Sequence, residues 1–217
     1  MKRMFCIIGL TGAGKSSYLN ALLKEFENEN LHRLVYYTTR KPRPNEVDGV
    51  DYHFVDRSEV PTYTVMAEDG RSLRKNPILI EHRLYKTMNN GYVDYFTTVD
   101  CVKEDFYLCA PSIEQLNSYI QYFGDSKIDI IEIKTDMKTR MIRVLNNRSY
   151  SDDDIYELCR RIVQEKIDWE KAGYDKILER YKNIGYISVD NSSQEESSFS
   201  KNMEMISNYI WDKSGMI

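Results

Sequence analysis

The sequence predicts an α/β fold with a mostly parallel central sheet, because segments typical of buried strands alternate along the chain with segments typical of amphipathic helices. The first pair is the clearest. Residues 4–8 form a continuous apolar run, as expected for a strand that is buried on both faces. After a glycine-rich stretch, apolar side chains recur at helical spacing at Leu19, Leu22, Leu23 and Phe26.

The segments up to residue 100 follow weaker patterns. Residues 34–39 are rich in β-branched and aromatic side chains and predict a second strand. Residues 40–55 cannot form a long helix, because they include Pro42, Pro44, Asn45 and Gly49. Residues 78–81 and 92–99 predict two more strands, with Asn90-Gly91 as a hairpin turn.

The second half of the chain continues the alternation. Residues 106–110 predict a buried strand, and a helix follows that opens with a capping box of Ser112 and Gln115 and ends at Gly124. Residues 128–133 predict the next strand, and the helix after it runs through Met141, Val144 and Leu145.

A polar break over residues 146–154 separates that helix from another, which begins at Ser151 with Asp154 three residues on. Residues 186–189 predict a last short strand, and residues 192–211 a final amphipathic helix.

Composition bounds the class of protein. With 217 residues, 41% of them hydrophobic and 29% charged, the chain predicts one domain, residues 1–217, with a sizeable core. No apolar run approaches the roughly 18 residues of a membrane span. The net charge of −4 argues against a nucleic-acid-binding surface. Four cysteines without a C-x-x-C pair favour a reducing cytoplasm, and we expect a monomer or homodimer.

One motif predicts nucleotide chemistry. Residues 9–16 read G-L-T-G-A-G-K-S and match the phosphate-binding P-loop, G-x-x-x-x-G-K-[ST], between a strand and a helix. Backbone N–H groups of such a loop surround phosphate oxygens, Lys15 reaches the β and γ phosphates, and Ser16 ligates Mg²⁺. The motif predicts the three-layer P-loop NTPase fold and ATP binding by Gly9, Thr11, Gly12, Ala13, Gly14, Lys15, Ser16 and Ser17. The alternative is a glycine-rich turn without a ligand.

A second group of candidate ligand-binding residues follows the P-loop along the chain. Arg40 and Arg43 lie three residues apart, Glu46 can orient a guanidinium, and Tyr52 offers a phenolic donor. Two arginine forks and a tyrosine make a suitable phosphate clamp. The alternative, a solvated surface loop with incidental charges, is the commoner origin of an arginine pair.

The stretch of residues 38–55 resembles the T-T-R-x-P-R-x-G-E-x-x-G-x-D-Y-x-F-V segment of the guanylate kinase family. Ile80-Glu81, Tyr95-Phe96-Thr97 and Cys159-Arg160-Arg161 resemble later segments of the same family. The resemblance implies a core of residues 1–35, 101–138 and 156–217, an inserted NMP-binding lobe over about 36–100 and a helical lid over about 139–155. It also implies that Arg40, Arg43, Tyr52 and Tyr95 hold the phosphate of GMP, and that Glu81 and Thr97 read the base.

The chain departs from the family pattern at three places. Asn45 stands where the family usually has Gly, and Tyr36 where it usually has Ser. Residues 106–112 contain no carboxylate, although the family usually has an acidic residue after this strand. The carboxylate that helps to place Mg²⁺ is therefore left open. So are two alternatives, a kinase of the same fold for dGMP or another phosphorylated acceptor, and a non-catalytic interaction module.

The resemblance further implies that lid arginines contact the transferring phosphoryl group. Arg143, Arg148 and Arg161 are the candidates, with Lys15 as the fourth catalytic residue, and the alternative for each arginine is an ordinary basic helix face. The expected reaction is GMP + ATP to GDP + ADP. No general base is required, because a phosphate monoester with a second pKa near 6 is already largely anionic at neutral pH.

Overall fold

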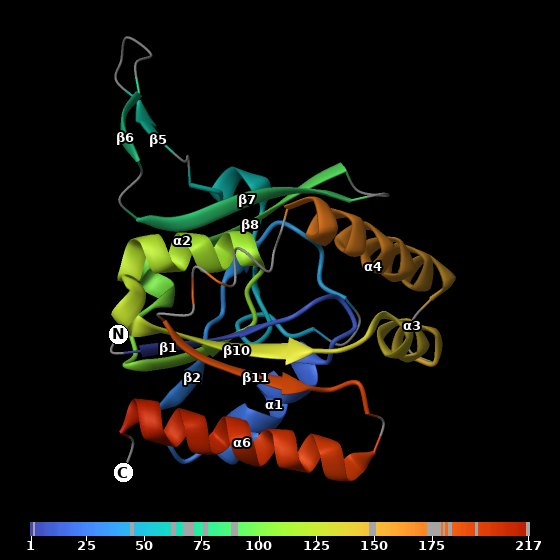
Figure 1. The fold of residues 1–217 in the computed structure, drawn as a ribbon. Coiled ribbons are helices and arrows are strands. Elements are labelled where there is room, and N and C mark those ends of the chain that lie inside the picture. The colour runs from blue at the N-terminus through green and yellow to red at the C-terminus, as the bar shows by residue number, and fades with distance from the viewer. Residues whose placement is uncertain are drawn as a thin grey trace.

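A five-stranded parallel sheet forms the centre of the molecule (Figure 1). The computed structural model describes residues 1–217 except 2, 44–45, 62–63, 67–71, 76–77, 88–90, 148–150, 173–178, 180, 182–183, 194 and 216–217. The strand order is β11-β10-β1-β9-β2, and every neighbouring pair is parallel. The strands are β1 (Arg3–Ile8), β2 (Leu31–Arg33), β9 (Phe106–Cys109), β10 (Ile128–Lys134) and β11 (Gly185–Asp190). The predicted α/β fold with a mostly parallel core sheet is confirmed.

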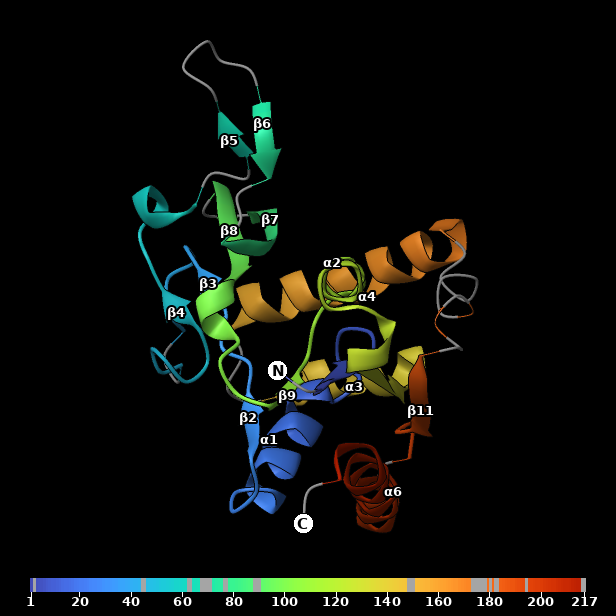
Figure 2. The same cartoon turned by 90° about the vertical axis from the view of Figure 1, so that its left-hand side faces the viewer.

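Helices cover both faces of this sheet and make three layers (Figure 2). Helices α1 (Lys15–Glu25) and α6 (Glu196–Ser214) lie on one face, and α2 (Ile113–Phe123) lies on the other. Alternate residues of β1 serve the two cores, because successive side chains of a strand point to opposite faces. Phe5 and Ile7 pack in the cluster with α1 and α6, whereas Met4, Cys6 and Ile8 pack in the cluster with α2.

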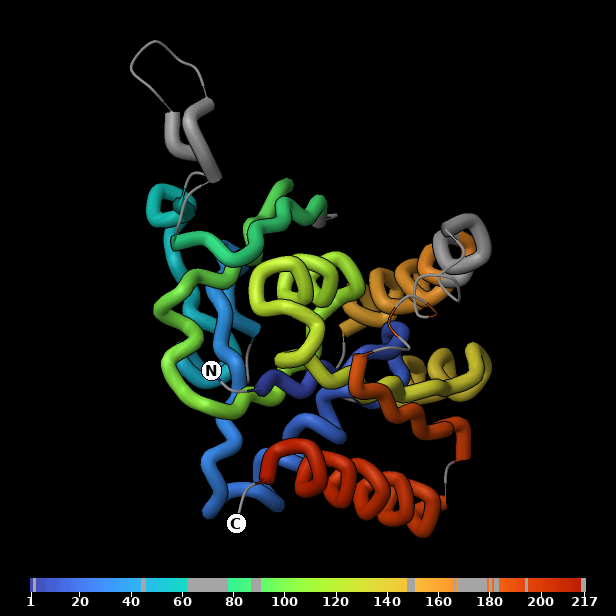
Figure 3. Tube along the Cα trace, turned by 60° about the vertical axis from the view of Figure 1, so that its left-hand side comes forward, coloured from blue at the N-terminus to red at the C-terminus, as the bar shows by residue number. Residues whose placement is uncertain are grey.

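The part of the chain that connects β2 to β9 forms a second sheet (Figure 3). Its order is β4-β3-β8-β7, with strands β3 (Tyr37–Thr38), β4 (His53–Phe54), β7 (Leu79–Thr87) and β8 (Gly91–Thr98). Strand β8 pairs antiparallel with both β7 and β3. A separate antiparallel pair consists of β5 (Thr64–Met66) and β6 (Ser72–Lys75).

The predicted single strand over residues 34–39 is wrong. The structure has β2 before this segment and β3 within it, and the two belong to different sheets. The Leu34 N–H still donates to the Leu108 carbonyl oxygen at 3.0 Å, after which the chain leaves the core sheet. Strand propensity is continuous across this point, whereas the sheet that each residue joins depends on distant partners.

Most of the remaining elements follow the predictions, but β7 continues to Thr87, well beyond the predicted residues 78–81. Helices α3 (Met137–Leu145) and α4 (Asp152–Ala172) lie where expected, and Ser112 and Gln115 form the predicted capping box of α2. The final helix starts at Glu196 and not at Ser192, whose N–H is engaged by the Asp190 carboxylate. Asn90 of the predicted turn lies outside the described residues. None of the described helices combines the length and apolar character of a membrane crossing.

Candidate active site

The segment of residues 9–16 takes the strand–loop–helix form that its sequence predicts. The chain leaves β1 before Gly9, and α1 begins at Lys15 after Gly14, whose φ of 101° lies in the left-handed region. A Cβ at Gly9 would lie only 2.6 Å from the Ile133 carbonyl oxygen. Glycine at these positions lets the loop turn tightly against β10. The N–H groups at the start of α1 form the positive end of the helix and suit an anion.

The Lys15 ammonium lies folded against its own loop. Its Nζ donates to the carbonyl oxygens of Gly9 at 2.6 Å and Leu10 at 3.1 Å. Burial lowers the pKa of Lys15, and the carboxylate of Glu165 opposes that shift. Hydrogen bonds to an anionic oxygen are stronger than those to a neutral carbonyl, so Lys15 is placed to exchange these carbonyls for phosphate oxygens.

Two charged residues from distant helices hold the same loop. Glu165 of α4 accepts hydrogen bonds from Thr11 N at 2.8 Å and from Thr11 Oγ1 at 2.6 Å. Arg140 of α3 is buried, lies 3.5 Å from the Glu165 carboxylate and donates to the Thr11 carbonyl oxygen at 3.2 Å. The loop is therefore tied to both α3 and α4.

A cavity of about 600 Å³ lies beside the start of α1 and is lined, among others, by Gly14, Ser17, Arg143, Asn146, Asn191 and Phe199. Arg143 donates to the carbonyl oxygens of Ala13 at 3.2 Å and Asn191 at 2.7 Å, so it braces the back of the loop. Ser16 and Ser17 are exposed in the first turn of α1.

A second cavity, of about 690 Å³, joins the loop to the second sheet. On the loop side it is lined by Gly9, Leu10, Thr11 and Lys15, and on the second sheet by Arg83 and Tyr95. Tyr36 and Tyr52 lie beside them, and Ser112, Gln115, Arg161 and Glu165 close the cavity from α4 and the start of α2. The predicted ATP loop and the predicted acceptor residues Tyr52 and Tyr95 thus face one space.

Arg40 forms a bidentate ion pair with Glu46 beside this cavity. Its Nη1 and Nη2 donate to the two Glu46 oxygens at 2.8 Å each, and its Nε donates to the Tyr95 hydroxyl at 3.1 Å. Its guanidinium carbon lies 5.2 Å from the centroid of the Tyr52 ring. Burial alone would lower the pKa of Arg40, but the hydrogen bonds with Glu46 and Tyr95 leave it raised.

Arg43 lies exposed near the start of α4. Its N–H donates to the Glu46 carboxylate at 2.8 Å, which keeps Glu46 between the two arginines. The pKa of Asp154 is lowered mainly by hydrogen bonds from Ser151, and the charge of Arg43 adds to that shift. The Arg43 charge is therefore available to a ligand between the second sheet and α4.

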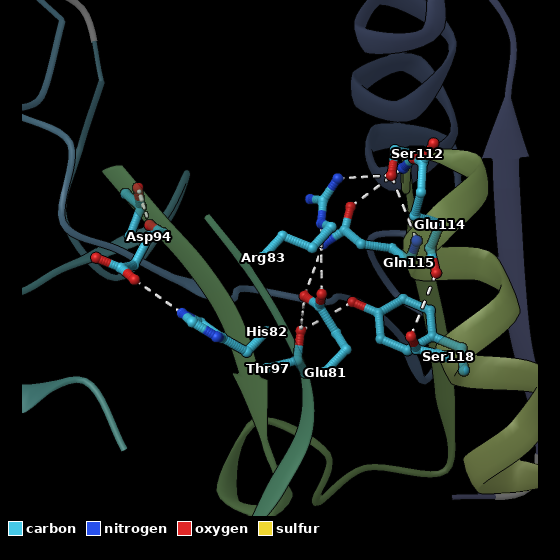
Figure 4. A network of polar contacts seen from close by, with 11 residues as sticks. Glu81, His82, Arg83, Asp94, Thr97, Ser112, Glu114, Gln115 and Ser118 are labelled. Atoms are coloured by element: carbon cyan, nitrogen blue, oxygen red, sulfur yellow. Dashed lines mark hydrogen bonds and ion pairs between the residues drawn. The ribbon is translucent and has the colours of Figure 1, made fainter. Parts of the chain in front are cut away.

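Glu81 lies in a buried polar network on β7 (Figure 4). Its Oε1 accepts from Gln115 Nε2 at 2.8 Å and from Thr97 Oγ1 at 3.1 Å, while its Oε2 lies 3.4 Å from Arg83 Nε. Burial raises the pKa of Glu81, and the Arg83 charge and the two donors oppose that shift. Thr97 is fully buried and also shares a hydrogen bond with Tyr119 at 2.9 Å. It therefore orients Glu81 from behind and does not reach the cavity wall.

The three predicted lid arginines have separate places. Arg161 of α4 lines the larger cavity, donates to Glu157 at 2.8 Å and lies 5.3 Å from the centroid of the Tyr85 ring. Arg143 lines the smaller cavity from α3. Arg148 lies outside the described residues.

The donor set fits a hydrated divalent cation. Among the described residues, no group of three or more His, Cys, Asp or Glu side chains is arranged to hold a metal ion. Glu132 and Glu165 line the cavity that contains Lys15, and Ser16 lies next to Lys15 on α1. Mg²⁺ keeps several waters and binds through one or two carboxylates and substrate phosphates, which these residues permit.

Sequence reasoning missed Arg83, Gln115, Glu132 and Glu165 as cavity residues. Only Gln115 carried a local signal, as part of the capping box, and that signal concerns helix initiation. The other three lie on β7, β10 and α4, and they reach the site only because these elements pack against distant segments of the chain.

Comparisons with known proteins agree with these features. Residues 1–70 match the family model described as guanylate kinase. The guanylate kinase of Zymomonas mobilis is 29% identical over 179 residues, 75% of this chain and 78% of that protein. The guanylate kinase of Lactococcus lactis is 28% identical over 191 residues, 80% of this chain and 90% of that protein. The crystal structure of guanylate kinase from Anaplasma phagocytophilum has the same fold, with a TM-score of 0.53 and 18% identity, over 97% of this chain and 85% of that chain. The resemblance predicted from residues 38–55 is confirmed.

Proposed function

We propose that this chain, a member of the guanylate kinase family, transfers the γ-phosphoryl group of ATP to the phosphate of GMP and yields ADP and GDP. One observation carries the proposal. A single cavity of about 690 Å³ is shared by Lys15 of the P-loop and by tyrosines of the second sheet, so donor and acceptor phosphates would meet in one space. In-line transfer requires that the two polyanionic nucleotides bind next to each other. The enzyme then catalyses the reaction mostly by positioning them and by neutralising their charge.

On the donor side, the loop of residues 9–16 would bind the triphosphate. Lys15 would move from the carbonyls of Gly9 and Leu10 to the β and γ phosphates. The resemblance implied that Arg143 contacts the transferring phosphoryl group. It lines the smaller cavity, and we propose that it supports the nucleoside end there. Ser16, with Glu132 or Glu165 through water, would hold Mg²⁺, which neutralises phosphate charge when bound.

On the acceptor side, Arg40, Arg43, Tyr52 and Tyr95 would hold the phosphate of GMP. The contacts of Arg40 with Glu46 and Tyr95 fix its guanidinium before a ligand arrives. Arg161 and Arg148 would approach from the lid and cover the transferring group, which also excludes water from the phosphoryl acceptor position.

Glu81 would read the base. A carboxylate accepts from guanine N1–H and from the 2-amino group, whereas adenine offers neither donor there and would leave a buried acceptor unpaired. Thr97 would act by holding Glu81 in place. The proposed lobe of about residues 36–100 supplies this acceptor site, and the proposed lid covers about 139–155. The cytoplasmic setting and the monomeric or dimeric state stay predictions.

The test is ADP release in a coupled assay with Mg-ATP and, in turn, GMP, dGMP, AMP, CMP and UMP. We expect GMP to give the fastest release, and the ratio of kcat/KM for GMP and dGMP measures the sugar preference. If ADP were released with only one of the other nucleotides, that nucleotide would be the acceptor instead of GMP. ATP binding without release on any nucleotide would contradict the kinase proposal and favour an interaction module.

Inhibition by guanosine is expected to weaken as the pH falls. Burial raises the pKa of Glu81, so this carboxyl gains its proton at a higher pH than an exposed glutamate, whose pKa is about 4.3. The protonated form has lost its charge and turns an O–H donor toward guanine donors. Guanosine lacks a phosphate, so the phosphate pKa near 6 does not contribute. The inhibition constant, measured from about pH 8 down to about pH 4, should rise toward the acid end. A constant value over that range would contradict the role of Glu81.

A further inference from the structure

Arg83 and Glu81 place a hydrogen-bond donor next to an acceptor in a loose ion pair. Within the described part of the chain, Arg83 Nε and Glu81 Oε2 are buried atoms that have no hydrogen-bond partner. They lie 3.4 Å apart, and the Arg83 side chain is 22% exposed. Buried polar atoms of this kind are rare and costly, and a ligand that pairs with both would remove the cost.

Both side chains point to the same side of β7. They are alternate residues of one strand, and alternate side chains of a strand share a face, about 7 Å apart at their Cα atoms. Arg83 lines the larger cavity, and Glu81 lies directly behind that wall. A planar ligand in this part of the cavity therefore meets the Arg83 guanidinium, and it contacts the buried Glu81 carboxylate once the side chains of the wall move aside.

The start of α2 holds the pair in this orientation. Arg83 Nη1 donates to Ser112 Oγ at 2.6 Å, which leaves Nε facing Glu81 (Figure 4). Gln115 accepts from Ser112 N at 3.1 Å through its amide oxygen, so its amide nitrogen must point to Glu81 Oε1. Arg83 Nη1 and Glu81 Oε1 are thus already engaged, whereas Nε and Oε2 have no hydrogen-bond partner and remain for a ligand.

We infer that Arg83 is a specificity-determining residue that donates to the oxygen at position six of the acceptor purine, beside the N1–H that Glu81 accepts. This inference rests on the proposed function and deepens it. Guanine presents the acceptor O6 next to the donor N1–H, which complements an arginine donor next to a carboxylate acceptor. Adenine presents the reverse order, an amino donor next to the acceptor N1, and mismatches both side chains.

The energetic consequence is selection by two adjacent contacts. A hydrogen bond to a charged group that is lost inside a buried site costs enough to change kcat/KM by about 10- to 100-fold.

The test compares GMP with 6-thio-GMP, which keeps N1–H and the 2-amino group but carries a weakly accepting sulfur at position six. The kcat/KM for both acceptors is measured with Mg-ATP in the wild type, Arg83→Met, Arg83→Lys and Arg57→Ala. Arg57 is a matched control, because its side chain is 66% exposed and it belongs to the same lobe. We expect the wild type and Arg57→Ala to prefer GMP about 10-fold or more, and Arg83→Met to lose that preference to within about twofold.

The two substrates separate a direct contact from a structural role. If Arg83 only supports Glu81, Arg83→Met lowers kcat/KM for both acceptors equally and the preference persists, which overturns the inference. Equal use of both acceptors by the wild type also overturns it. Arg83→Lys keeps a charge beside Glu81 and guards against misfolding of the methionine variant, and we expect an intermediate preference.

A wild-type chain that transfers no phosphoryl group would contradict the proposed function instead. In that case calorimetric titration of GMP and 6-thio-GMP into the wild type and Arg83→Met decides the inference by itself. A preference for GMP that Arg83→Met removes supports the contact, and its absence in the wild type overturns it.

Discussion

Replacement of Lys15 by alanine is expected to lower kcat by about 10³-fold, the largest effect of any single substitution proposed for this chain. The Lys15 ammonium lies at the loop that faces both cavities, and its only described hydrogen bonds go to the carbonyls of Gly9 and Leu10. Because both partners are neutral carbonyls, the ammonium can exchange them for the anionic oxygens of the transferring phosphoryl group. Steady-state kinetics with saturating GMP and Mg-ATP measure the loss.

Two comparisons separate this effect from misfolding. Lys24→Ala removes an exposed lysine from the last turn of the same helix and should leave kcat unchanged. Thermal unfolding of Lys15→Ala should show a folded protein, because burial of Lys15 already lowers its pKa and the ammonium adds little to stability. A kcat within about tenfold of the wild type would place the transferring phosphoryl group away from Lys15.

Glu81→Gln is expected to lower kcat/KM for GMP by about 10²- to 10³-fold and to leave the low activity with AMP unchanged or raised. The amide can still accept from Thr97 and Gln115 through its oxygen. Its NH₂ group then faces Arg83 and the guanine donors. The hydrogen bonds to N1–H and to the 2-amino group are lost, because a donor on the protein faces a donor on the base. The ratio of kcat/KM for GMP and AMP is the measurement.

A matched acidic residue provides the control for charge. Glu104 is half exposed in the loop before β9, and Glu104→Gln should keep both kcat/KM values. If Glu81→Gln lowered kcat/KM for GMP and for AMP by the same factor, Glu81 would support the fold of the second sheet and not the choice of base. An unchanged preference for GMP would assign base selection to other groups in the cavity.

Local sequence determined the parts of the site that lie close together in the chain. The apolar run before Gly9 and the helical spacing after Ser16 are enough to specify β1, the loop and α1, because a buried strand and an amphipathic helix have different periods. The capping box at Ser112 and the arginine spacing around Glu46 were also evident, and both appear as hydrogen bonds over three to six residues.

Tertiary structure decided which distant groups meet at that site. Residues 34–39 have one continuous strand propensity, yet β2 and β3 join different sheets because their partners lie in β9 and β8. Glu165 contacts Thr11 across 154 residues, and Arg83 reaches Ser112 across 29. An isolated Glu or Arg at such positions has no local pattern that separates it from an exposed surface residue. Its function depends on burial and on the groups that face it, and these arise only when the sheets and helices pack.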